Sequence, residues 1–321
     1  MTVDEIYMQR CLQLASLGLG DVQPNPMVGA VIVKDGQIIG EGYHHKYGGP
    51  HAEVNAIHSV ENKELLKEST IYVNLEPCSH FGKTPPCADL IVRMGIPKVV
   101  VGTVDYHDKV NGHGIAKLQE AGIEVVTGVC EADCVELNRR FFTYHRQHRP
   151  YVILKWAETA DGFMDIDRST NPTDSYWITN PALKVVVHKW RSEEDAILVG
   201  YNTMVNDKPQ LTTRLYPGKD PQRYLMQRGN EQVAPLPCIL TPSNVEECLQ
   251  IMYDNRVQSV IVEGGRKTLD LFLASGLWDE ARILVGNQRW GKGLPAPALA
   301  LTPDKIEVMD NNKIMYVRRH L

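Results

Sequence analysis

His51-Ala52-Glu53, followed by Pro77-Cys78 and by Cys87, is the pattern that says most about the fold of this chain of 321 residues. It offers one imidazole and two thiolates, with a carboxylate two residues after the imidazole. A catalytic zinc ion has three protein ligands and an open position for water, whereas a structural zinc ion has four protein ligands. The sequence therefore predicts that His51, Cys78 and Cys87 hold a Zn²⁺ ion with hydrolytic chemistry.

Glu53 has a different role in this pattern. Zinc deaminases carry H-x-E and then P-C-x-x-C, and their Glu is no ligand but moves protons between the zinc-bound water and the departing amine. We therefore predict that Glu53 is the catalytic acid and base. Cys78 and Cys87 are nine positions apart rather than three, so a polar and basic loop separates the two ligands.

A structural role is the alternative for each cysteine. Cysteines inside cells are often small buried hydrophobic residues, and His-x-Glu alone occurs by chance in many helices. The order of the residues, each after a predicted strand, favours the zinc site. Cys130 and Cys134 are one helical turn apart, which would suit a second metal site, but no His or further Cys is nearby. We expect structural roles for this pair and for Cys11, Cys238 and Cys248.

The composition is that of a globular protein with room for two domains. The chain is 43% hydrophobic and 23% charged, which is ordinary for soluble proteins. Residues 1–146 carry 13 Lys and Arg and 18 Asp and Glu, whereas residues 147–321 carry 21 of each kind. Nucleic-acid enzymes normally have a basic face. The acidic half with the zinc pattern therefore argues against a tRNA or DNA deaminase.

We expect a cytoplasmic protein without a membrane or nucleic-acid partner. The N-terminus lacks the basic and apolar regions of a signal peptide, and no apolar run approaches the ~18 residues of a membrane span. Seven cysteines, an odd number without the spacing of a disulfide framework, suit a reducing compartment.

Strands and helices alternate along the first 146 residues. Asp35-Gly36 is a strong hairpin turn, and Pro85-Pro86 begins a helix that ends near Gly95. The predicted strands are 28–33, 38–42, 70–75, 98–103 and 123–127, and the predicted helices are 51–59, 85–95, 115–121 and 132–145. This predicts an α/β sandwich with helices over a mostly parallel sheet. Both halves of the zinc pattern begin helices, whose positive N-terminal ends favour the thiolates.

Residues 146–150, Arg-Gln-His-Arg-Pro, form a charged segment without apolar periodicity that is typical of a domain boundary. After it we predict strands at 151–157, 196–199 and 259–262 and helices at 181–191 and 246–255. The second domain is thus also α/β. The two predicted domains are residues 1–146 and 151–321.

These motifs resemble the bifunctional riboflavin-biosynthesis enzymes, in which a pyrimidine deaminase is fused to a reductase. In the first half the resemblance rests on 24–29 (Pro-Asn-Pro-Met-Val-Gly), 40–44 (Gly-Glu-Gly-Tyr-His), 51–53 and the very specific run 75–87. In the second half it rests on Lys155, Asp161-Gly162, 175–179, Arg191, 200–214 and 262–265. It implies a cytidine-deaminase-like α/β/α sandwich followed by a dihydrofolate-reductase-like α/β domain.

The resemblance also implies the chemistry of the first domain. The substrate is a small molecule, 2,5-diamino-6-(5-phosphoribosylamino)pyrimidin-4-one, whose 2-amino group is replaced by oxygen. Lys83 is a suitable point charge for the sugar phosphate, and a turn or surface role is the alternative for Asn25 and His44. The residues that the resemblance places around the substrate are Asn25, His44, His80, Lys83 and Thr84.

For the second domain the resemblance implies NADPH-dependent reduction of the ribose C1′. A glycine pair between a strand and a helix lets backbone amides approach the cofactor pyrophosphate. The implied cofactor-binding residues are Trp177, Thr203, Asp207, Gly264 and Gly265. The implied substrate-binding residues are Ser175, Arg191, Leu211, Arg214 and Glu263, with the arginines on phosphate or polar groups, although a surface salt bridge is their alternative. A homo-oligomer is expected.

The second domain departs from the family pattern in several places. Only 48 residues separate Arg214 from Glu263, so this domain is shortened. Residues 223–237 and 286–297 also differ from the family, as do residues 105–108 of the first domain, and 227–237 is predicted to be a loop. An active deaminase with a non-catalytic scaffold or dimerisation domain therefore remains an alternative. A third possibility is a binding protein with structural zinc, which Glu53 and the three-ligand pattern disfavour.

Overall fold

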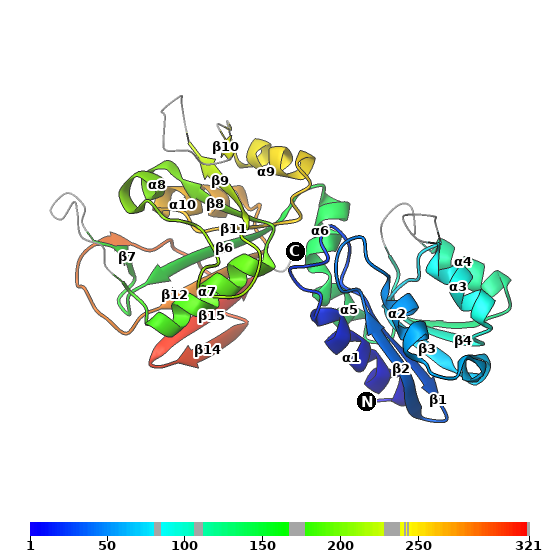
Figure 1. The fold of residues 1–321 in the computed structure, drawn as a ribbon. Coiled ribbons are helices and arrows are strands. Elements are labelled where there is room, and N and C mark those ends of the chain that lie inside the picture. The colour runs from blue at the N-terminus through cyan, green and yellow to red at the C-terminus, as the bar shows by residue number, and fades with distance from the viewer. Residues whose placement is uncertain are drawn as a thin grey trace. The chain divides into compact units, whose positions relative to one another are not determined.

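The computed structural model describes residues 1–79, 85–105, 112–166, 177–227, 238–240, 242 and 244–319. The chain forms two compact units, Met1–Gln147 and His148–Leu321. Each unit combines helices with a sheet of its own (Figure 1). Within the described ranges, no helix is both long and apolar enough to cross a membrane.

The first unit is built on a five-stranded sheet in the order β2-β1-β3-β4-β5. Its strands are β1 (Gly29–Lys34), β2 (Gln37–Tyr43), β3 (Thr70–Leu75), β4 (Lys98–Thr103) and β5 (Glu124–Thr127). Its helices are α1 (Val3–Ser16), α2 (Ala52–Ser59), α3 (Cys87–Met94), α4 (His113–Glu120), α5 (Glu131–Leu137) and α6 (Arg139–Gln147), with a 3-10 turn at Lys63–Glu68.

Helices cover both faces of this sheet because alternate strand residues point to opposite faces. In β1, Ala30 and Ile32 belong to the apolar cluster under α2, α3 and α4. Val31 and Val33 belong to the cluster that contains residues of α1 and α5. The result is the α/β/α sandwich that the sequence predicts.

Two details differ from the expected arrangement. The sheet is mixed, because β1 pairs antiparallel with both β2 and β3, whereas β3, β4 and β5 are parallel. The helix predicted at 132–145 is two helices, which meet at Asn138. The Asn138 side chain is buried and binds the Met27 backbone, with 2.8 Å to the amide nitrogen and 2.9 Å to the carbonyl oxygen. Helical periodicity cannot reveal such a tertiary contact.

The second unit contains an eight-stranded sheet in the order β10-β9-β8-β11-β6-β12-β15-β14 and a two-stranded ribbon of β7 and β13. The strands are β6 (Tyr151–Glu158), β7 (Phe163–Asp165), β8 (Ala196–Gly200), β9 (Gln222–Met226), β10 (Cys238–Leu240), β11 (Ser259–Val262), β12 (Glu280–Val285), β13 (Leu294–Pro295), β14 (Lys305–Met309) and β15 (Asn312–Arg318). The helices are α7 (Pro181–Glu193), α8 (Tyr201–Asp207), α9 (Val245–Asp254) and α10 (Arg266–Ser275).

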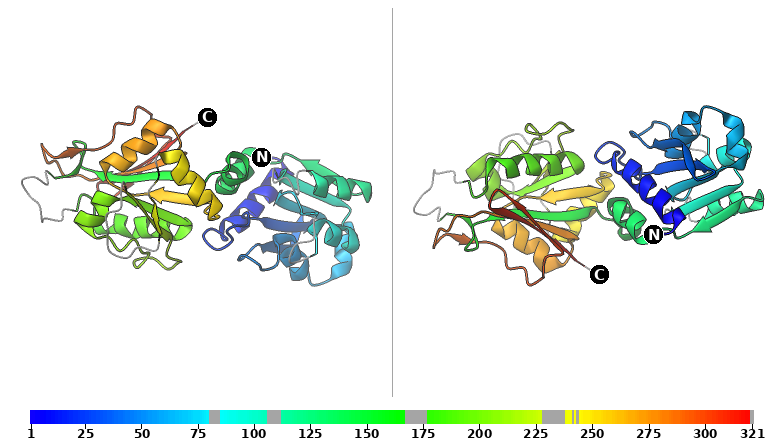
Figure 2. Two further views of the ribbon diagram at one scale, coloured as in Figure 1. Left: turned by 90° about the horizontal axis from the view of Figure 1, so that it is seen from above. Right: turned by 90° about the horizontal axis from the view of Figure 1, so that it is seen from below.

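The same alternation gives this sheet two covered faces. Val152 and Leu154 of β6 join the apolar cluster that contains residues of α9 and α10, whereas Tyr151 and Ile153 join the cluster of α7. Figure 2 shows the sheet between α7 and α10. In the order of the sheet, the six described strands β10, β9, β8, β11, β6 and β12 are parallel to one another. β15 pairs antiparallel with β12, and β14 pairs antiparallel with β15. Parallel strands bring their carboxyl ends to one edge of the sheet.

The segments that depart from the family pattern are partly described. Residues 223–226 form most of β9, and Tyr224 and Leu225 are buried. Residues 228–237, which include most of the predicted loop, lie outside the described residues, as do 106–108. In the segment 286–297, Leu294 and Pro295 form β13, which pairs with β7.

The Asn138 contact predicts a specific loss of stability. Asn138→Ala should lower the free energy of unfolding of the first unit by about 1–3 kcal/mol, because it leaves the buried Met27 N–H unpaired. Asn62→Ala is the matched control, since Asn62 is exposed and caps only the 3-10 turn. Urea unfolding of both variants measures the effect. Equal losses in the two variants would contradict this role of Asn138.

Candidate active sites

The three predicted zinc ligands lie at the ends of elements of the first unit. His51 immediately precedes α2, Cys78 follows the carboxyl end of β3, and Cys87 is the first residue of α3. The helix starts follow from local sequence, since Pro85-Pro86 directly precedes α3 and proline suits the beginning of a helix. Local sequence sets where the two helices begin, and the sheet brings their N-termini to the end of β3.

The geometry of these ligands suits a zinc ion. His51 Nδ1 lies 3.6 Å from Cys78 Sγ and 3.3 Å from Cys87 Sγ, and the three donor atoms all lie within 4.8 Å of one another. A tetrahedral zinc ion with ordinary bond lengths separates its nitrogen and sulfur ligands by about 3.6 Å. In the part of the chain that the structure describes, this is the group whose donor atoms could hold a metal ion.

The electrostatics of the group favour a thiolate at Cys78. The hydrogen bond from Cys87 lowers the pKa of Cys78 to about 4, and His51 acts in the same direction. The hydrogen bond between His51 and Cys78 raises the pKa of His51 to about 9. The hydrogen bond between Cys87 and Cys78 raises the pKa of Cys87. A thiolate is the form of cysteine that binds metals.

Glu53 lies beside the ligands on the first turn of α2. Its side chain is buried, and burial raises the pKa of its carboxyl group, while the positive charge of His51 acts in the opposite direction. A carboxyl group whose pKa moves toward neutrality is suited to both take up and release a proton. This geometry fits the predicted acid and base.

Asn25 and His44 lie next to the ligand group. Asn25 Nδ2 is 3.0 Å from His44 Nε2, and His44 Nδ1 is 2.9 Å from the Pro50 carbonyl oxygen. Because that carbonyl can only accept, Nδ1 carries the proton and the Asn25 amide donates to Nε2. The rings of His44 and His51 meet edge to face with centroids 5.6 Å apart. His80, Lys83 and Thr84 lie outside the described residues, so their substrate contacts remain predictions.

The second candidate site lies at the carboxyl end of β11, beside Lys155 of β6, where Glu263 is buried between two cations. Arg191 of α7 donates to both of its carboxylate oxygens, with Nε 2.7 Å from Oε1 and Nη2 2.8 Å from Oε2. Lys155 Nζ lies 3.5 Å from Oε2. Burial alone would raise the pKa of Glu263, but Lys155 and Arg191 outweigh it and lower the pKa to about 2. The carboxylate is therefore fully ionised.

Sequence motifs did not reveal this pairing. Lys155 was only one residue of a wider motif, and Arg191 and Glu263 were each expected to contact substrate. The structure commits three Arg191 donors to protein, because Nη1 also lies 3.1 Å from the Thr212 carbonyl oxygen. Substrate contacts of Arg191 and Glu263 remain predictions. The signal that could have indicated the pairing is a lysine inside the largely apolar strand β6, which requires a carboxylate on a neighbouring element.

The predicted cofactor residues Thr203, Gly264 and Gly265 lie together. Gly265 N–H donates to Thr203 Oγ1 at 2.7 Å. A Cβ on Gly264 would lie 2.5 Å from Gly200 N and 2.7 Å from Val199 Cα. Only glycine therefore fits at position 264, which lies against the end of β8. Asp207, another predicted cofactor residue, is the last residue of α8, whereas Gly264 and Gly265 directly precede α10. The turn offers backbone amides at the N-terminus of α10, as an anion site requires.

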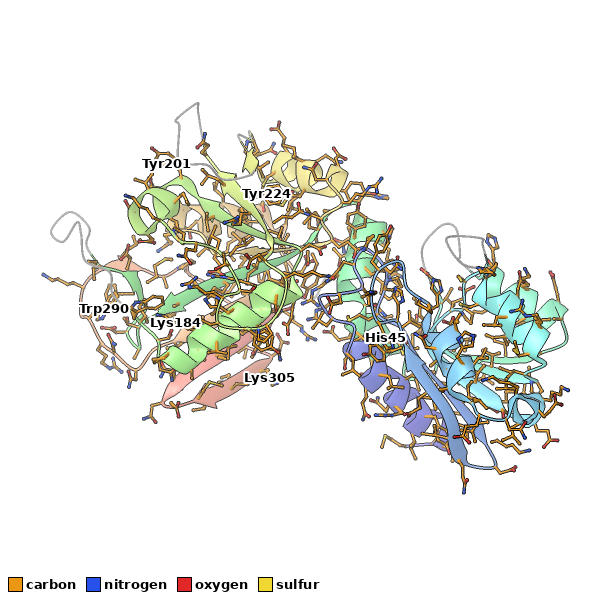
Figure 3. All side chains as sticks on the ribbon, in the orientation of Figure 1. His45, Lys184, Tyr201, Tyr224, Trp290 and Lys305 are labelled. Atoms are coloured by element: carbon orange, nitrogen blue, oxygen red, sulfur yellow. The ribbon has the colours of Figure 1, made fainter. Side chains whose placement is uncertain are left out.

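The remaining predicted residues of the second site have different surroundings. The Leu211 side chain is buried in the core and its φ is 56°, so only its backbone can meet a ligand. Arg214 is exposed, with Nη1 3.3 Å from Thr212 Oγ1. Trp177 is 58% exposed, and Lys184 Nζ, labelled on α7 in Figure 3, lies 3.2 Å from its ring centroid. Ser175 lies outside the described residues.

Comparisons with known proteins identify both halves of the chain. Residues 1–103 match the cytidine and deoxycytidylate deaminase zinc-binding region, and residues 150–298 match the RibD C-terminal domain. The riboflavin biosynthesis protein RibD of Aquifex aeolicus is 38% identical to this chain in an alignment that covers 99% of each protein.

The chain belongs to the RibD family. A diaminohydroxyphosphoribosylaminopyrimidine deaminase/5-amino-6-(5-phosphoribosylamino)uracil reductase from Thermotoga maritima is 37% identical, with a TM-score of 0.88 over 98% of each chain. RibD of Acinetobacter baumannii in one crystal form is 31% identical, with a TM-score of 0.90 over 98% of each chain. The predicted resemblance and fold class are confirmed. The match of residues 150–298 does not favour a second domain that is only a scaffold.

The segment 286–297, which differs from the RibD family pattern, is bound to Asp161 through two backbone amides. The Asp161 carboxylate accepts hydrogen bonds from the Trp290 and Gly291 amides at 3.2 and 2.8 Å. It also accepts one from the Thr159 hydroxyl, which is the main cause that lowers the Asp161 pKa to about 2. This segment is thereby anchored at the turn that follows β6.

The Glu263 pairing predicts a strong effect of neutralising its charge. Glu263→Gln should lower the free energy of unfolding of the second unit by about 3–5 kcal/mol, because Lys155 and Arg191 are left buried without a counter-charge. Glu307→Gln is the control, since Glu307 pairs with Lys305 at the surface and should cost at most about 1 kcal/mol. Thermal and urea unfolding measure both variants.

The same pairing sets the pH dependence of that difference. The pKa of Glu263 is lowered from 4.5 to about 2 on folding, so its stabilisation is present above the unfolded-state value and is lost as the pH falls toward 2. The difference in the free energy of unfolding between wild type and Glu263→Gln should therefore become smaller as the pH falls across this range. A gap that is constant from neutral pH to pH 2 would contradict the assignment.

Proposed function

We propose that this RibD protein catalyses two successive steps of riboflavin biosynthesis. The first is deamination of 2,5-diamino-6-(5-phosphoribosylamino)pyrimidin-4-one, and the second is NADPH-dependent reduction of the ribose of the product to a ribityl chain. The observation that carries the proposal is the His51, Cys78 and Cys87 group beside buried Glu53, in a chain that aligns over its whole length with RibD proteins. Residues 1–146 would carry the deaminase and residues 151–321 the reductase.

In the deaminase, His51, Cys78 and Cys87 would hold Zn²⁺. A bound zinc ion lowers the pKa of a water molecule so that it can act as a nucleophile at neutral pH. Glu53 would take the proton of that water and pass protons to the ring nitrogen and to the departing ammonia. Asn25, oriented by its bond to His44, would bind the pyrimidine, and Lys83 the sugar phosphate.

In the reductase, NADPH supplies the hydride for the ribose C1′. Gly264 and Gly265, which have no side chains, would let the turn before α10 approach the cofactor pyrophosphate. Thr203 fixes this turn because its hydroxyl oxygen accepts the Gly265 N–H. Trp177 and Asp207 are the further candidate cofactor contacts. Glu263, held by Lys155 and Arg191, would bind substrate together with Arg214, Ser175 and Leu211.

We further infer a cytoplasmic homo-oligomer that acts on a small molecule and binds neither nucleic acid nor membrane. The acidic balance of residues 1–146 supports the absence of a nucleic-acid partner. Association between copies is supported by the exposed apolar side chains of Ile306 and Val308, which are 54% and 70% exposed on the edge strand β14.

Glu53→Gln tests the deaminase chemistry. This variant keeps the shape of the side chain but cannot shuttle protons, so deamination should fall by about 10²–10⁴-fold while zinc content remains about one ion per chain. Cys87→Ser is the contrast, because it should lose the metal as well. The measurements are metal analysis and ammonia release by each full-length variant. Loss of zinc from Glu53→Gln would mean that the carboxylate is a ligand.

Gly264→Ala tests the cofactor site. The added Cβ would push the turn away from β8, so the KM for NADPH should rise by about tenfold, which corresponds to 1.4 kcal/mol. Deamination by the same variant is the internal control and should be unchanged. NADPH oxidation is measured with the deaminated intermediate over a wide cofactor range. An unchanged KM would remove this turn from the cofactor site.

A further inference from the structure

Glu76, two residues before Cys78, is a buried carboxylate that the mechanism above does not use. Its side chain is 4% exposed. Oε1 accepts from the Gly114 and Ile115 amides at 2.8 and 3.2 Å, and Oε2 accepts from the Gly112 and Asp105 amides at 3.0 and 3.2 Å. One carboxylate thus satisfies four backbone donors from two segments of the chain.

These donors show what Glu76 does for α4. Gly112 is the N-cap of α4 and has no side chain to cap it, so the first amides of the helix need an acceptor from elsewhere. Glu76 supplies that acceptor from the end of β3. A charged acceptor forms stronger hydrogen bonds than a neutral one. The ligand loop and α4 are therefore held together by charge-assisted bonds.

The backbone of the two elements is also in direct contact at this point. A Cβ on Gly114 would lie 1.9 Å from the Pro77 carbonyl oxygen. Pro77 is the residue between Glu76 and Cys78, so α4 presses against the peptide that carries the ligand. The Glu76 backbone amide is fixed as well, by a 3.0 Å bond to the Thr103 carbonyl oxygen at the end of β4.

We infer that Glu76 is a positioning residue of the deaminase, which clamps the Pro77-Cys78 segment against α4 so that the Cys78 thiolate is held at the metal site. This inference rests on the proposed zinc-dependent function. Residues that hold metal ligands in their orientation contribute to metal affinity, and their loss lowers that affinity about 10–100-fold. Glu76 acts through Cys78 and not on the substrate.

Two variants disturb the clamp from opposite sides. Glu76→Gln turns one acceptor oxygen into a donor, which in either orientation faces two backbone N–H groups. Gly114→Ala keeps Glu76 but drives Pro77 away from α4. The added Cβ clashes with the Pro77 carbonyl oxygen whatever Glu76 does, so Gly114→Ala tests the contact of the ligand loop with α4, and Glu76→Gln tests the carboxylate. The positioning role requires that both variants loosen the metal.

Tyr72→Phe is the control variant. It removes a partly buried hydrogen bond, which the Tyr72 hydroxyl donates to Asp4 at 2.7 Å. Tyr72 belongs to the same strand β3, but this bond does not involve the ligand loop. Reductase activity with the deaminated intermediate reports whether each full-length variant is folded in its second unit, and thermal unfolding reports on the first unit.

The experiment is competition for zinc between each full-length protein and a chromophoric chelator. We expect Glu76→Gln and Gly114→Ala to bind zinc about 10–100-fold more weakly than wild type, and Tyr72→Phe to bind it as wild type does even if it melts earlier. Wild-type zinc affinity in either clamp variant would overturn the positioning role alone. A wild-type protein without zinc would overturn the proposed function and this inference with it.

Discussion

The deaminase site depends on the convergence of three short segments at the carboxyl end of β3. His51, Cys78 and Cys87 come from the start of α2, the loop after β3 and the start of α3. No two of them are close enough in sequence to form the site by local structure alone. The sheet places the segments together, and the donor atoms then lie within 4.8 Å of one another. Every chemical property of the first unit follows from this arrangement.

In the second unit, the main constraint is a group of charged side chains that is buried beside an apolar sheet. Glu263 follows β11, a strand whose four residues are all buried. A lone carboxylate there would be costly, but Lys155 and Arg191 from neighbouring elements compensate it. The Arg191–Glu263 pair fixes α7 to the end of β11, directly before the Gly264-Gly265 turn. The architecture of the site and its electrostatics are thus inseparable.

Local patterns predicted much of this from the sequence. Strands and helices around the zinc pattern could be placed because caps, turns and apolar runs are encoded within a few residues. The contacts that no local pattern shows are tertiary. Glu76 meets amides from 29 to 39 residues later in the chain, and Asn138 interrupts an otherwise helical stretch to bind Met27. The Arg191–Glu263 pair likewise exists only because α7 packs over the end of β11.

The central claim is that one chain performs deamination and then reduction. It is tested most directly by incubating the full-length protein with the diaminopyrimidine substrate in water labelled with heavy oxygen, with and without NADPH, followed by mass spectrometry. The account predicts that the label replaces the 2-amino group in both reactions and that the product is further reduced to its ribityl form only when NADPH is present. Absence of label in the product, or absence of reduction at saturating NADPH after complete deamination, would contradict it.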